Sequence, residues 1–288
     1  MKFHFRIHLK CDDQAAVFYC GRTEKMMKKQ LLAILFLCLF TIGFHASAAG
    51  VITGTAPAQN SKTKPGRSFV LTYHLISSES EDWSDYCVSP ADLEADILYC
   101  INNGYTFLRS KDLENPLNQN AKYVLLTFDD GYESDYIHVF PLLEKYKIPA
   151  AFFIVGSFVG KAGYLSSEQI KTMSTSAYVE FGNHSYSLHE KSLADLKKLY
   201  ANTANLTAII EDYRKTDQLL RQLTGKPCSA LSFPYGEYSV ALLSSLREEF
   251  GNLITFSTEH RYLNLSFITL PAGRINRAHS YQIKYIAG

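Results

Sequence analysis

The segment from residue 123 to 131 constrains the fold of this chain most. It reads Tyr-Val-Leu-Leu-Thr-Phe-Asp-Asp-Gly, an apolar run with the length of a buried strand, followed at once by two carboxylates and a glycine. Ligands in α/β folds bind at the C-terminal ends of strands, so we expect Asp129 and Asp130 at such a rim, outside the core. Adjacent residues of an extended chain point different ways, so one acid can bind a metal while the other accepts a proton. An ordinary turn is the alternative.

The first 48 residues have the features of an export signal. A basic stretch before residue 31 is followed by an apolar run of 14 residues, Leu31 to Phe44, and then by Ala-Ser-Ala ending at Ala48. We expect residues 1–48 to comprise an upstream extension and a secretory signal peptide cleaved after Ala48. The protein is then secreted or associated with the cell surface, and an uncleaved signal would tether it to the membrane.

The charge of the exported part excludes one class of partner. Residues 49–288 contain 22 basic and 25 acidic residues, a net charge of about −3, without a basic cluster. Such a surface is unsuited to nucleic acid, whose binding depends on clustered lysine and arginine. We therefore expect no nucleic-acid partner.

Three cysteines remain after the signal: Cys87, Cys100 and Cys228. An odd number excludes a fully paired framework, and no Cys-x-x-Cys motif is present. We interpret them as packing residues with at most one disulfide, for which Cys87 and Cys100 are the candidate pair.

One domain accounts for the remainder of the chain. Residues 49–66 have the composition of a flexible linker, and residues 67–288 form the predicted domain. Short apolar segments alternate there with helical ones, which favours parallel strands joined by crossover helices. We expect an α/β fold, a deformed (β/α) barrel of about seven units, with a doubly wound open sheet as the alternative. The expected strands are 68–74, 123–128, 149–155, 178–183, 229–233 and 253–257. One helix is expected to start at Ser89 and to stop at residues 103–104. Further helices are expected at 134–147, 166–175, 192–224 and 238–249, and the helix at 192–224 should be interrupted near 202–205.

Two histidines follow another predicted strand. His184 and His189 come after residues 178–183, and in a parallel barrel this strand ends at the same rim as Asp129 and Asp130. One carboxylate and two imidazoles would leave a divalent metal open to water and substrate, as in catalytic zinc sites. The spacing of five does not align the two rings on a regular helix, so an irregular loop has to bring them together. Two solvent-exposed loop histidines are the alternative.

A third motif, Phe-Pro-Tyr-Gly at residues 233–236, ends the predicted strand 229–233. Such a stiff turn can direct a backbone N–H group into the mouth of a barrel, where it would help to stabilise an oxyanion. Taken alone, the motif is simply a turn.

In this order, Thr-Phe-Asp-Asp-Gly (127–131), His-Ser-x-x-x-His (184–189) and Phe-Pro-Tyr-Gly (233–236) resemble the first three motifs of the polysaccharide deacetylase family, the NodB-like carbohydrate esterases. The resemblance covers about residues 68–277. It implies a NodB-type deformed barrel and a hydrolase acting on linear amides, which removes N-acetyl groups from a glycan with a divalent metal, commonly zinc.

The resemblance also implies a role for each motif residue. Asp129 would be the general base, Asp130, His184 and His189 the metal ligands, and the backbone N–H of Tyr235 part of the oxyanion hole. These roles agree with a mechanism in which metal-activated water attacks the acetamide.

The chain departs from the common family pattern at two places. Ser232 occupies the position where many members have an arginine that braces the base, and no late Leu-x-x-His supplies an acid. His74, at the end of the first predicted strand, resembles the acid of the branch that deacetylates poly-N-acetylglucosamine. Arg274 is the candidate to brace Asp129. A histidine packed under the sheet edge is the alternative for His74.

The predicted function is a secreted metal-dependent N-deacetylase, acting on poly-N-acetylglucosamine, peptidoglycan or a chitin-like glycan as a monomer. An O-acetyl xylan esterase and a non-catalytic glycan-binding relative are the alternatives. Aromatic residues near the motifs are candidates for stacking on sugar rings: Trp83, Tyr132 and Tyr186.

Overall fold

The computed structural model describes residues 66–79, 84–251, 253–278 and 282–288. The chain divides into two units, Met1–Ser61 and Lys62–Gly288, and every described residue lies in the second. The predicted signal peptide lies outside the described residues, as does the predicted linker apart from Gly66. No helix among the described residues is long and apolar enough to cross a membrane.

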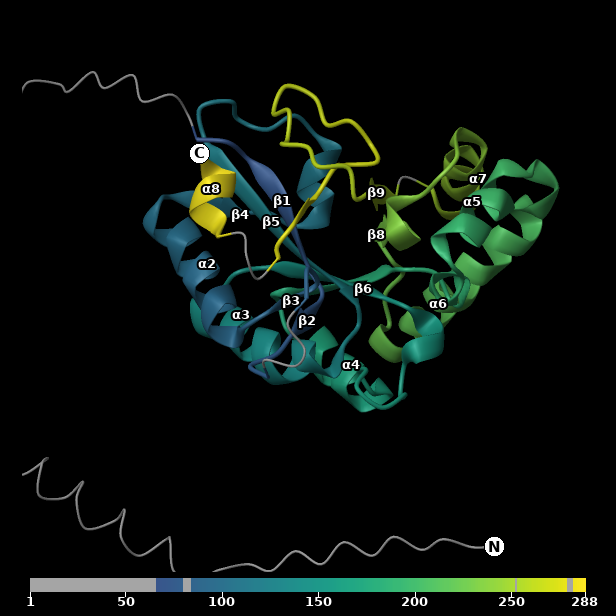
Figure 1. Cartoon of the computed structure of the whole chain (residues 1–288), viewed down its shortest axis with the longest axis horizontal. Coiled ribbons are helices and arrows are strands. Elements are labelled where there is room, and N and C mark those ends of the chain that lie inside the picture. The colour runs from purple at the N-terminus through teal and green to yellow at the C-terminus, as the bar shows by residue number, and fades with distance from the viewer. Residues whose placement is uncertain (1–65, 80–83, 252, 279–281) are drawn as a thin grey trace, which may run out of the picture. The chain divides into compact units, whose positions relative to one another are not determined.

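Parallel strands form the centre of the fold (Figure 1). Within the described residues, eight strands make one sheet in the order β10-β1-β5-β6-β7-β8-β9, and β4 also pairs with β5. Each expected strand is present, because each is an apolar run covered on both faces. The sheet consists of β1 (Phe69–Tyr73), β4 (Tyr105–Phe107), β5 (Lys122–Asp130), β6 (Ala150–Ile154), β7 (Val179–Asn183), β8 (Ala230–Ser232), β9 (Ile254–Phe256) and β10 (Ile275–Asn276), of which β4 and β10 were not among the expected strands. A separate pair, β2 (Leu75–Ile76) and β3 (Cys87–Val88), follows β1.

Residues 272–276, called the closing segment below, connect the two edges of this sheet. At one edge Ala272 donates its N–H to the carbonyl of Thr255 (2.7 Å) and accepts from the N–H of Ser257 (2.9 Å), which extends β9. At the other edge β10 pairs with β1, with Ile275 opposite Leu71. The sheet is therefore curled into a deformed barrel. The predicted fold class is confirmed, and the doubly wound open sheet is wrong.

Helices cover the outside of the curled sheet (Figure 1). The predicted helix start is confirmed, because Ser89 caps α2 by accepting the N–H of Asp92, with Pro90 as the first helical residue. The predicted long helix is two helices separated by a short turn, η6 (Thr203–Asn205), at the expected interruption. The helices are α2 (Pro90–Asn102), α3 (Phe140–Tyr146), α4 (Ser167–Ser174), α5 (Leu193–Ala201), α6 (Leu206–Thr224), α7 (Val240–Phe250) and α8 (Ile283–Ala287). Shorter helical turns are η2 (Ser110–Glu114), η3 (Asp135–Val139), η4 (Gly156–Phe158), η5 (Leu188–Glu190) and η7 (Pro234–Gly236).

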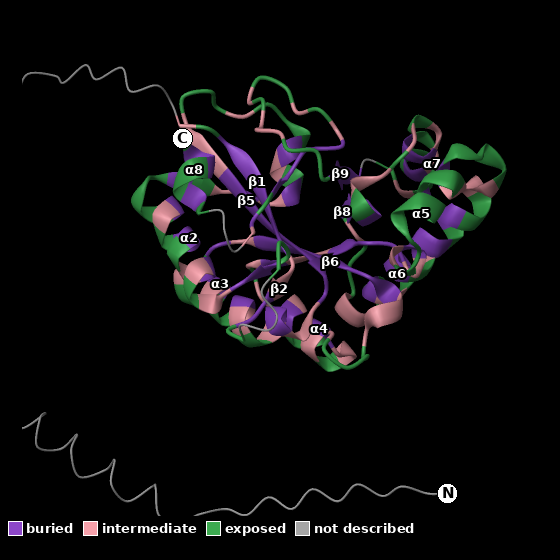
Figure 2. Cartoon of the chain, viewed as in Figure 1, coloured by how far each residue is buried: buried purple, intermediate pink, exposed green. Residues whose placement is uncertain are grey.

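The two faces of β5 have different surroundings, and both are buried (Figure 2). Leu126 and Phe128 pack under the helices, where Phe128 stacks between Tyr73 and Phe152 with ring centroids 5.1 Å away on each side. Leu125 faces the barrel interior instead. Because side chains alternate along a strand, Asp129 also points inward.

The suggested disulfide between Cys87 and Cys100 is wrong. Both side chains are buried, Cys87 in β3 and Cys100 in α2, and no disulfide joins them. Burial raises the pKa of the Cys100 thiol to about 12, so this thiol stays protonated and unreactive. The cysteines serve as small packing residues, which agrees with the rest of the prediction.

Candidate metal centre and active site

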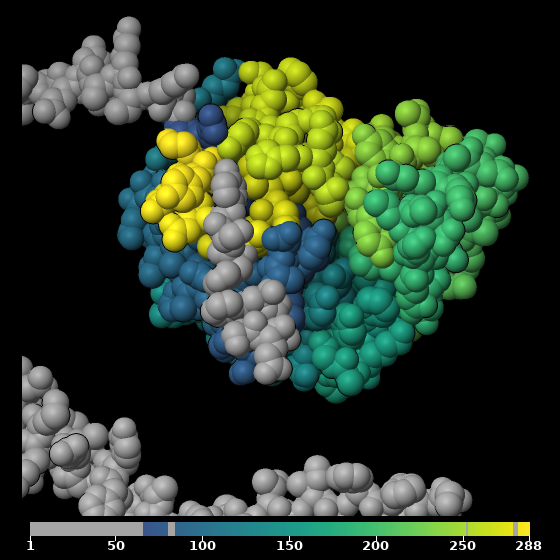
Figure 3. Space-filling view, in the orientation of Figure 1, coloured from purple at the N-terminus to yellow at the C-terminus, as the bar shows by residue number. Residues whose placement is uncertain are grey.

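A cavity of about 660 Å³ lies at the C-terminal ends of the strands, and all six predicted site residues line it. These are His74, Asp129, Asp130, His184, His189 and Tyr235. Segments far apart in the sequence lie side by side on one face of the molecule, where the first described residues, the region around residues 190–240 and the C-terminal segment adjoin in the space-filling view (Figure 3). Barrel folds bind ligands at this end of the sheet.

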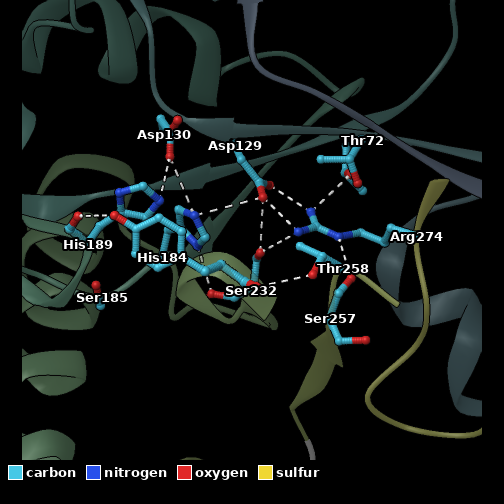
Figure 4. A network of polar contacts seen from close by, with 12 residues as sticks. Thr72, Asp129, Asp130, His184, Ser185, His189, Ser232, Ser257, Thr258 and Arg274 are labelled. Atoms are coloured by element: carbon cyan, nitrogen blue, oxygen red, sulfur yellow. Dashed lines mark hydrogen bonds and ion pairs between the residues drawn. The ribbon is translucent and has the colours of Figure 1, made fainter. Parts of the chain in front are cut away.

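Asp130, His184 and His189 form the only cluster among the described residues whose side chains could hold a metal ion. Asp130 ends β5, His184 follows β7, and His189 lies in η5. Oδ1 of Asp130 lies 3.5 Å from Nε2 of His184 and 3.3 Å from Nε2 of His189 (Figure 4). For a tetrahedral zinc ion with bonds of about 2.0–2.2 Å, ligand atoms lie roughly 3.4 Å apart, so this spacing fits.

Two further observations support a cation at this position. Oδ1 of Asp130 is buried and has no hydrogen-bond partner in the described part of the chain, which would be costly without a bound ion. Nδ1 of His184 lies 2.8 Å from the carbonyl oxygen of Ser232. A carbonyl can only accept, so Nδ1 carries the hydrogen, and the lone pair of Nε2 faces Asp130.

The charges of this cluster are strongly coupled. Burial alone would raise the pKa of Asp130, but His184 and His189 outweigh it, and the pKa lies below its ordinary value. Burial likewise opposes protonation of His184, yet Asp129 and Asp130 raise its pKa overall. A proton on His184 and a metal ion are therefore competitors for the same nitrogen.

Asp129 is held by a buried arginine. Nη1 and Nη2 of Arg274 donate to the two carboxylate oxygens of Asp129, each at 2.7 Å (Figure 4). Asp129 is 2% exposed and Arg274 1%. Burial would raise the pKa of Asp129, but Arg274 and His184 outweigh it and hold the pKa well below its usual range. The predicted bracing by Arg274 is confirmed. Asp129 lies at the expected rim, but the expectation that it lies outside the core is wrong, because its strand points the carboxylate into the barrel.

Ser232 has a role that the sequence did not reveal. Its hydroxyl donates to Oδ2 of Asp129 (3.2 Å) and accepts from Nη2 of Arg274 (2.8 Å), so the serine contacts both members of the pair. The carbonyl of the same residue orients His184. Ser232 thus connects the proposed base to a proposed metal ligand.

His74 lies in the same cavity, immediately after β1. Its ring packs edge-on against Tyr86, with centroids 5.0 Å apart, and its buried Nδ1 has no hydrogen-bond partner among the described residues. Burial lowers the pKa of His74, and the nearby Asp129 and Asp130 offset this only in part. The free protein at neutral pH therefore has a mostly neutral His74.

Tyr235 closes another side of the cavity. Its ring stacks on His189, with centroids 4.7 Å apart, and its single hydroxyl hydrogen is shared between the carbonyls of His189 (3.1 Å) and Lys191 (3.0 Å). Its backbone adopts the left-handed conformation, with φ 54° and ψ 12°, which is strained for a residue with a Cβ atom. The side-chain contacts fix this conformation and with it the direction of the backbone N–H.

The aromatic residues expected near the site have different positions. Tyr132 lines the cavity and stacks on Tyr164, with centroids 5.1 Å apart. Tyr186 is not among the lining residues, and Trp83 lies outside the described residues. Tyr86 lines the cavity and was not expected to do so; its only signal was its place at the end of the polar segment 76–86, which follows the first predicted strand.

Comparison with known proteins gives a family match over part of the chain. Residues 117–249 match the polysaccharide deacetylase family. The chain contains a polysaccharide deacetylase domain. The predicted family and the predicted enzyme class, a hydrolase, are therefore confirmed.

Individual relatives of the deacetylase domain agree with this result. The chain is 27% identical over 238 residues to the poly-beta-1,6-N-acetyl-D-glucosamine N-deacetylase of Staphylococcus aureus strain MRSA252, covering 73% of this chain and 80% of that protein. The structure of IcaB from Ammonifex degensii aligns with a TM-score of 0.64 at 27% identity over 74% of this chain and 92% of that one. A polysaccharide deacetylase from Bacillus cereus has the same fold, with a TM-score of 0.62 at 24% identity over 77% and 68% of the two chains.

Replacing Arg274 by methionine should destabilise the domain in a pH-dependent way. The change leaves the Asp129 carboxylate buried and unpaired, which costs about 3–5 kcal/mol near pH 7. In the wild type the lowered pKa of Asp129 means that the pair stabilises the fold above the unfolded-state pKa of about 3.9, and that this contribution is lost as pH falls through the folded-state pKa. In the variant Asp129 can take a proton at mildly acidic pH, so the difference should shrink from pH 7 to about pH 4. Denaturant unfolding over this range measures it.

The double variant Arg274→Met with Asp129→Asn is the control. Removing both charges leaves no unpaired carboxylate, so much of the lost stability should return and the pH dependence of the difference should disappear. A penalty for Arg274→Met that is the same at all pH values would contradict the assignment.

Proposed function

We propose that this protein is a metal-dependent polysaccharide N-deacetylase that removes N-acetyl groups from a glycan containing N-acetylglucosamine. The observation that carries the proposal is the presence of an ionised acid, Asp129, beside a separate three-residue metal site in one cavity. A binding protein would need no base at that position. We further propose that residues 1–48 direct export, which places the enzyme at the cell surface or outside the cell.

Asp130, His184 and His189 would hold the metal ion, with zinc as the proposed identity. A bound divalent ion polarises the acetamide carbonyl and makes water acidic enough to lose a proton near neutral pH. Three protein ligands leave further positions for water and substrate.

Asp129 would accept the proton of the attacking water. Its lowered pKa keeps it ionised at neutral pH, as a base must be, but also makes it a weak base. It can serve only if the water is already acidified, which is why base and metal site have to lie together. Arg274 and Ser232 both donate to Oδ2 of Asp129, and Arg274 also donates to Oδ1. The carboxylate is therefore fixed, and the lone pair of Oδ1 that accepts no hydrogen bond has a constant direction from which to take the proton.

His74 is the proposed acid for the leaving amine. Because it is mostly neutral in the free protein, it has to gain a proton during the cycle before it can donate one. The opposite charges of Asp129 and Asp130 favour that protonated form. The backbone N–H of Tyr235 is the proposed donor to the oxyanion that develops on the carbonyl oxygen.

The name of the Staphylococcus aureus relative supports poly-N-acetylglucosamine as the substrate. The cavity also suits a sugar, since Tyr86 and Tyr132 provide aromatic faces beside the polar centre. Among the described lining residues outside the proposed catalytic and metal-binding groups and Arg274, none is charged, which agrees with an uncharged glycan.

Acetate release tests the proposed reaction. The mature protein, residues 49–288, is stripped of metal, reloaded with zinc and incubated with N-acetylglucosamine oligomers and with O-acetylated xylan. We expect zinc-dependent acetate from the amino-sugar oligomers, and a loss of about 10²–10⁴-fold in Asp129→Asn, in line with removal of a general base. Release from xylan alone would make the protein an esterase, and no release from either with zinc bound would favour a glycan-binding protein.

The role of His74 has a separate test. His74→Ala should lower turnover of the oligomers by about 10²–10⁴-fold, because the leaving amine loses its acid, while zinc content stays at the wild-type level. Turnover and zinc content are measured on the same preparation. A near-normal rate would show that another group protonates the amine.

A further inference from the structure

We infer that Asp212, on the outer helix α6, is a positioning residue that shapes the loop carrying His184 and His189. The inference rests on the proposed metal site, and Asp212 itself is not among the residues that line the cavity. Residues 184–189 are called the histidine loop below.

The histidine loop has no regular structure that could place its two imidazoles. A spacing of five does not put two side chains on one face of a helix, and only Leu188–Glu190 forms a short helical turn, η5. Ser185 adopts the left-handed conformation with φ 69°, which is unfavourable for a residue with a Cβ atom. Groups outside the loop therefore have to hold its backbone in place.

Asp212 makes the largest set of these contacts. Its Oδ1 accepts the N–H of Tyr186 at 2.7 Å, and its Oδ2 accepts the N–H and the hydroxyl of Ser187 at 3.0 Å and 2.6 Å. Asp212 is only 8% exposed, so these hydrogen bonds to an ionised group are little weakened by water. One carboxylate thus fixes two consecutive peptide groups between the histidines.

The helix that carries Asp212 is itself attached to β7, where the histidine loop begins. The side-chain amide of Asn183, the last residue of β7, donates to the carbonyl of Tyr213 at 2.8 Å, and its oxygen accepts the N–H of Ser185 at 2.8 Å. The start of the loop and Asp212 therefore have a fixed relative position.

Residues 156 and 157, in η4, also hold the loop. Gly156 donates its N–H to the carbonyl of Ser185 (3.0 Å), and Ser157 donates to that of Tyr186 (2.9 Å). A Cβ atom at residue 156 would lie 2.4 Å from Oγ1 of Thr216 on α6, so only glycine allows this close approach. Both η4 and α6 therefore hold the loop, and Asp212 is the charged group among these contacts.

The two histidines depend on Asp212 to different degrees. His184 has its own support in the carbonyl of Ser232, whereas the backbone of His189 is held by the hydroxyl of the half-exposed Tyr235. Loss of the Asp212 contacts should therefore displace His189 first. Displacing one ligand of three weakens metal binding, and supporting residues of this kind typically change metal affinity by about 10- to 100-fold.

Asp212→Asn is the test variant. The amide has nearly the same size, but its NH₂ group would face an N–H donor, so at least one of the loop peptides loses its acceptor. We expect zinc affinity, measured by competition with a chelator, to fall by about 10- to 100-fold. Zinc-dependent turnover should need correspondingly more zinc and recover when zinc is in excess.

The matched control is Asp217→Asn on the same helix. Asp217 is 7% exposed and also accepts a backbone N–H, that of Cys228 at 3.0 Å, but at the segment that leads into β8. Asp217→Asn loses the acceptor for the Arg221 guanidinium (3.3 Å) but keeps an amide oxygen for the Cys228 N–H. It should therefore cost some stability while keeping the zinc affinity of the wild type within about threefold. Ser187→Ala removes only the hydroxyl contact with Asp212, so it should also weaken zinc binding, but less than Asp212→Asn does. If Asp212→Asn does not fold, Ser187→Ala tests the inference in its place.

Two results would overturn the inference: wild-type zinc affinity in both Asp212→Asn and Ser187→Ala, or an equal loss of affinity in Asp217→Asn. Failure of the proposed function is distinguishable from either, because the wild-type protein would then bind no zinc at the histidines or release no acetate.

Discussion

The buried pair between Asp129 and Arg274 is the interaction on which the rest of this structure depends. Arg274 lies in the closing segment, which hydrogen-bonds to β9 at one end and to β1 at the other. Its guanidinium binds both oxygens of Asp129 at the end of β5, and its Nε donates to the carbonyl of Ser257 at 3.1 Å. The segment that closes the barrel thus also carries the side chain that positions the proposed base. An unpaired charge at either position would be costly, so removing one partner alone should destabilise the barrel.

From this pair a chain of polar contacts leads to the proposed metal ligands. The hydroxyl of Ser232 bonds to both members of the pair, and the carbonyl of the same residue orients His184. Tyr235 follows three residues later and supports His189 through its carbonyl. The short segment 232–235 at the end of β8 therefore contacts the proposed base and two of the proposed metal ligands, and it also carries the proposed oxyanion donor. A stiff turn at Pro234 suits this role, because it holds these groups in fixed relative positions.

The sequence predicted the sheet well because each main strand is an apolar run buried on both faces, a pattern that short helices rarely show. It predicted Asp129, Asp130, His184 and His189 as a group because parallel strands end at one rim of a barrel. His74 and the role of Tyr235 came from the family resemblance, and the roles of all six residues stay predictions. It did not reveal the inward direction of Asp129, the use of Ser232 in place of an arginine, or the contacts of Asp212. Those features depend on contacts between residues that lie more than 20 positions apart in the sequence. Hydrophobic periodicity carries no information about such contacts. A partial signal existed for Asp212, because it lies on the buried face of α6 with Ile209, Tyr213 and Thr216.

The most direct measurement is anomalous X-ray scattering at the zinc edge from crystals of the zinc-loaded protein. The account predicts one strong peak bonded to Oδ1 of Asp130 and Nε2 of His184 and His189, with Asp129 still paired to Arg274. A zinc ion bound elsewhere, or no peak between these three atoms at saturating zinc, would contradict the central claim that this cavity is a metal-dependent active site.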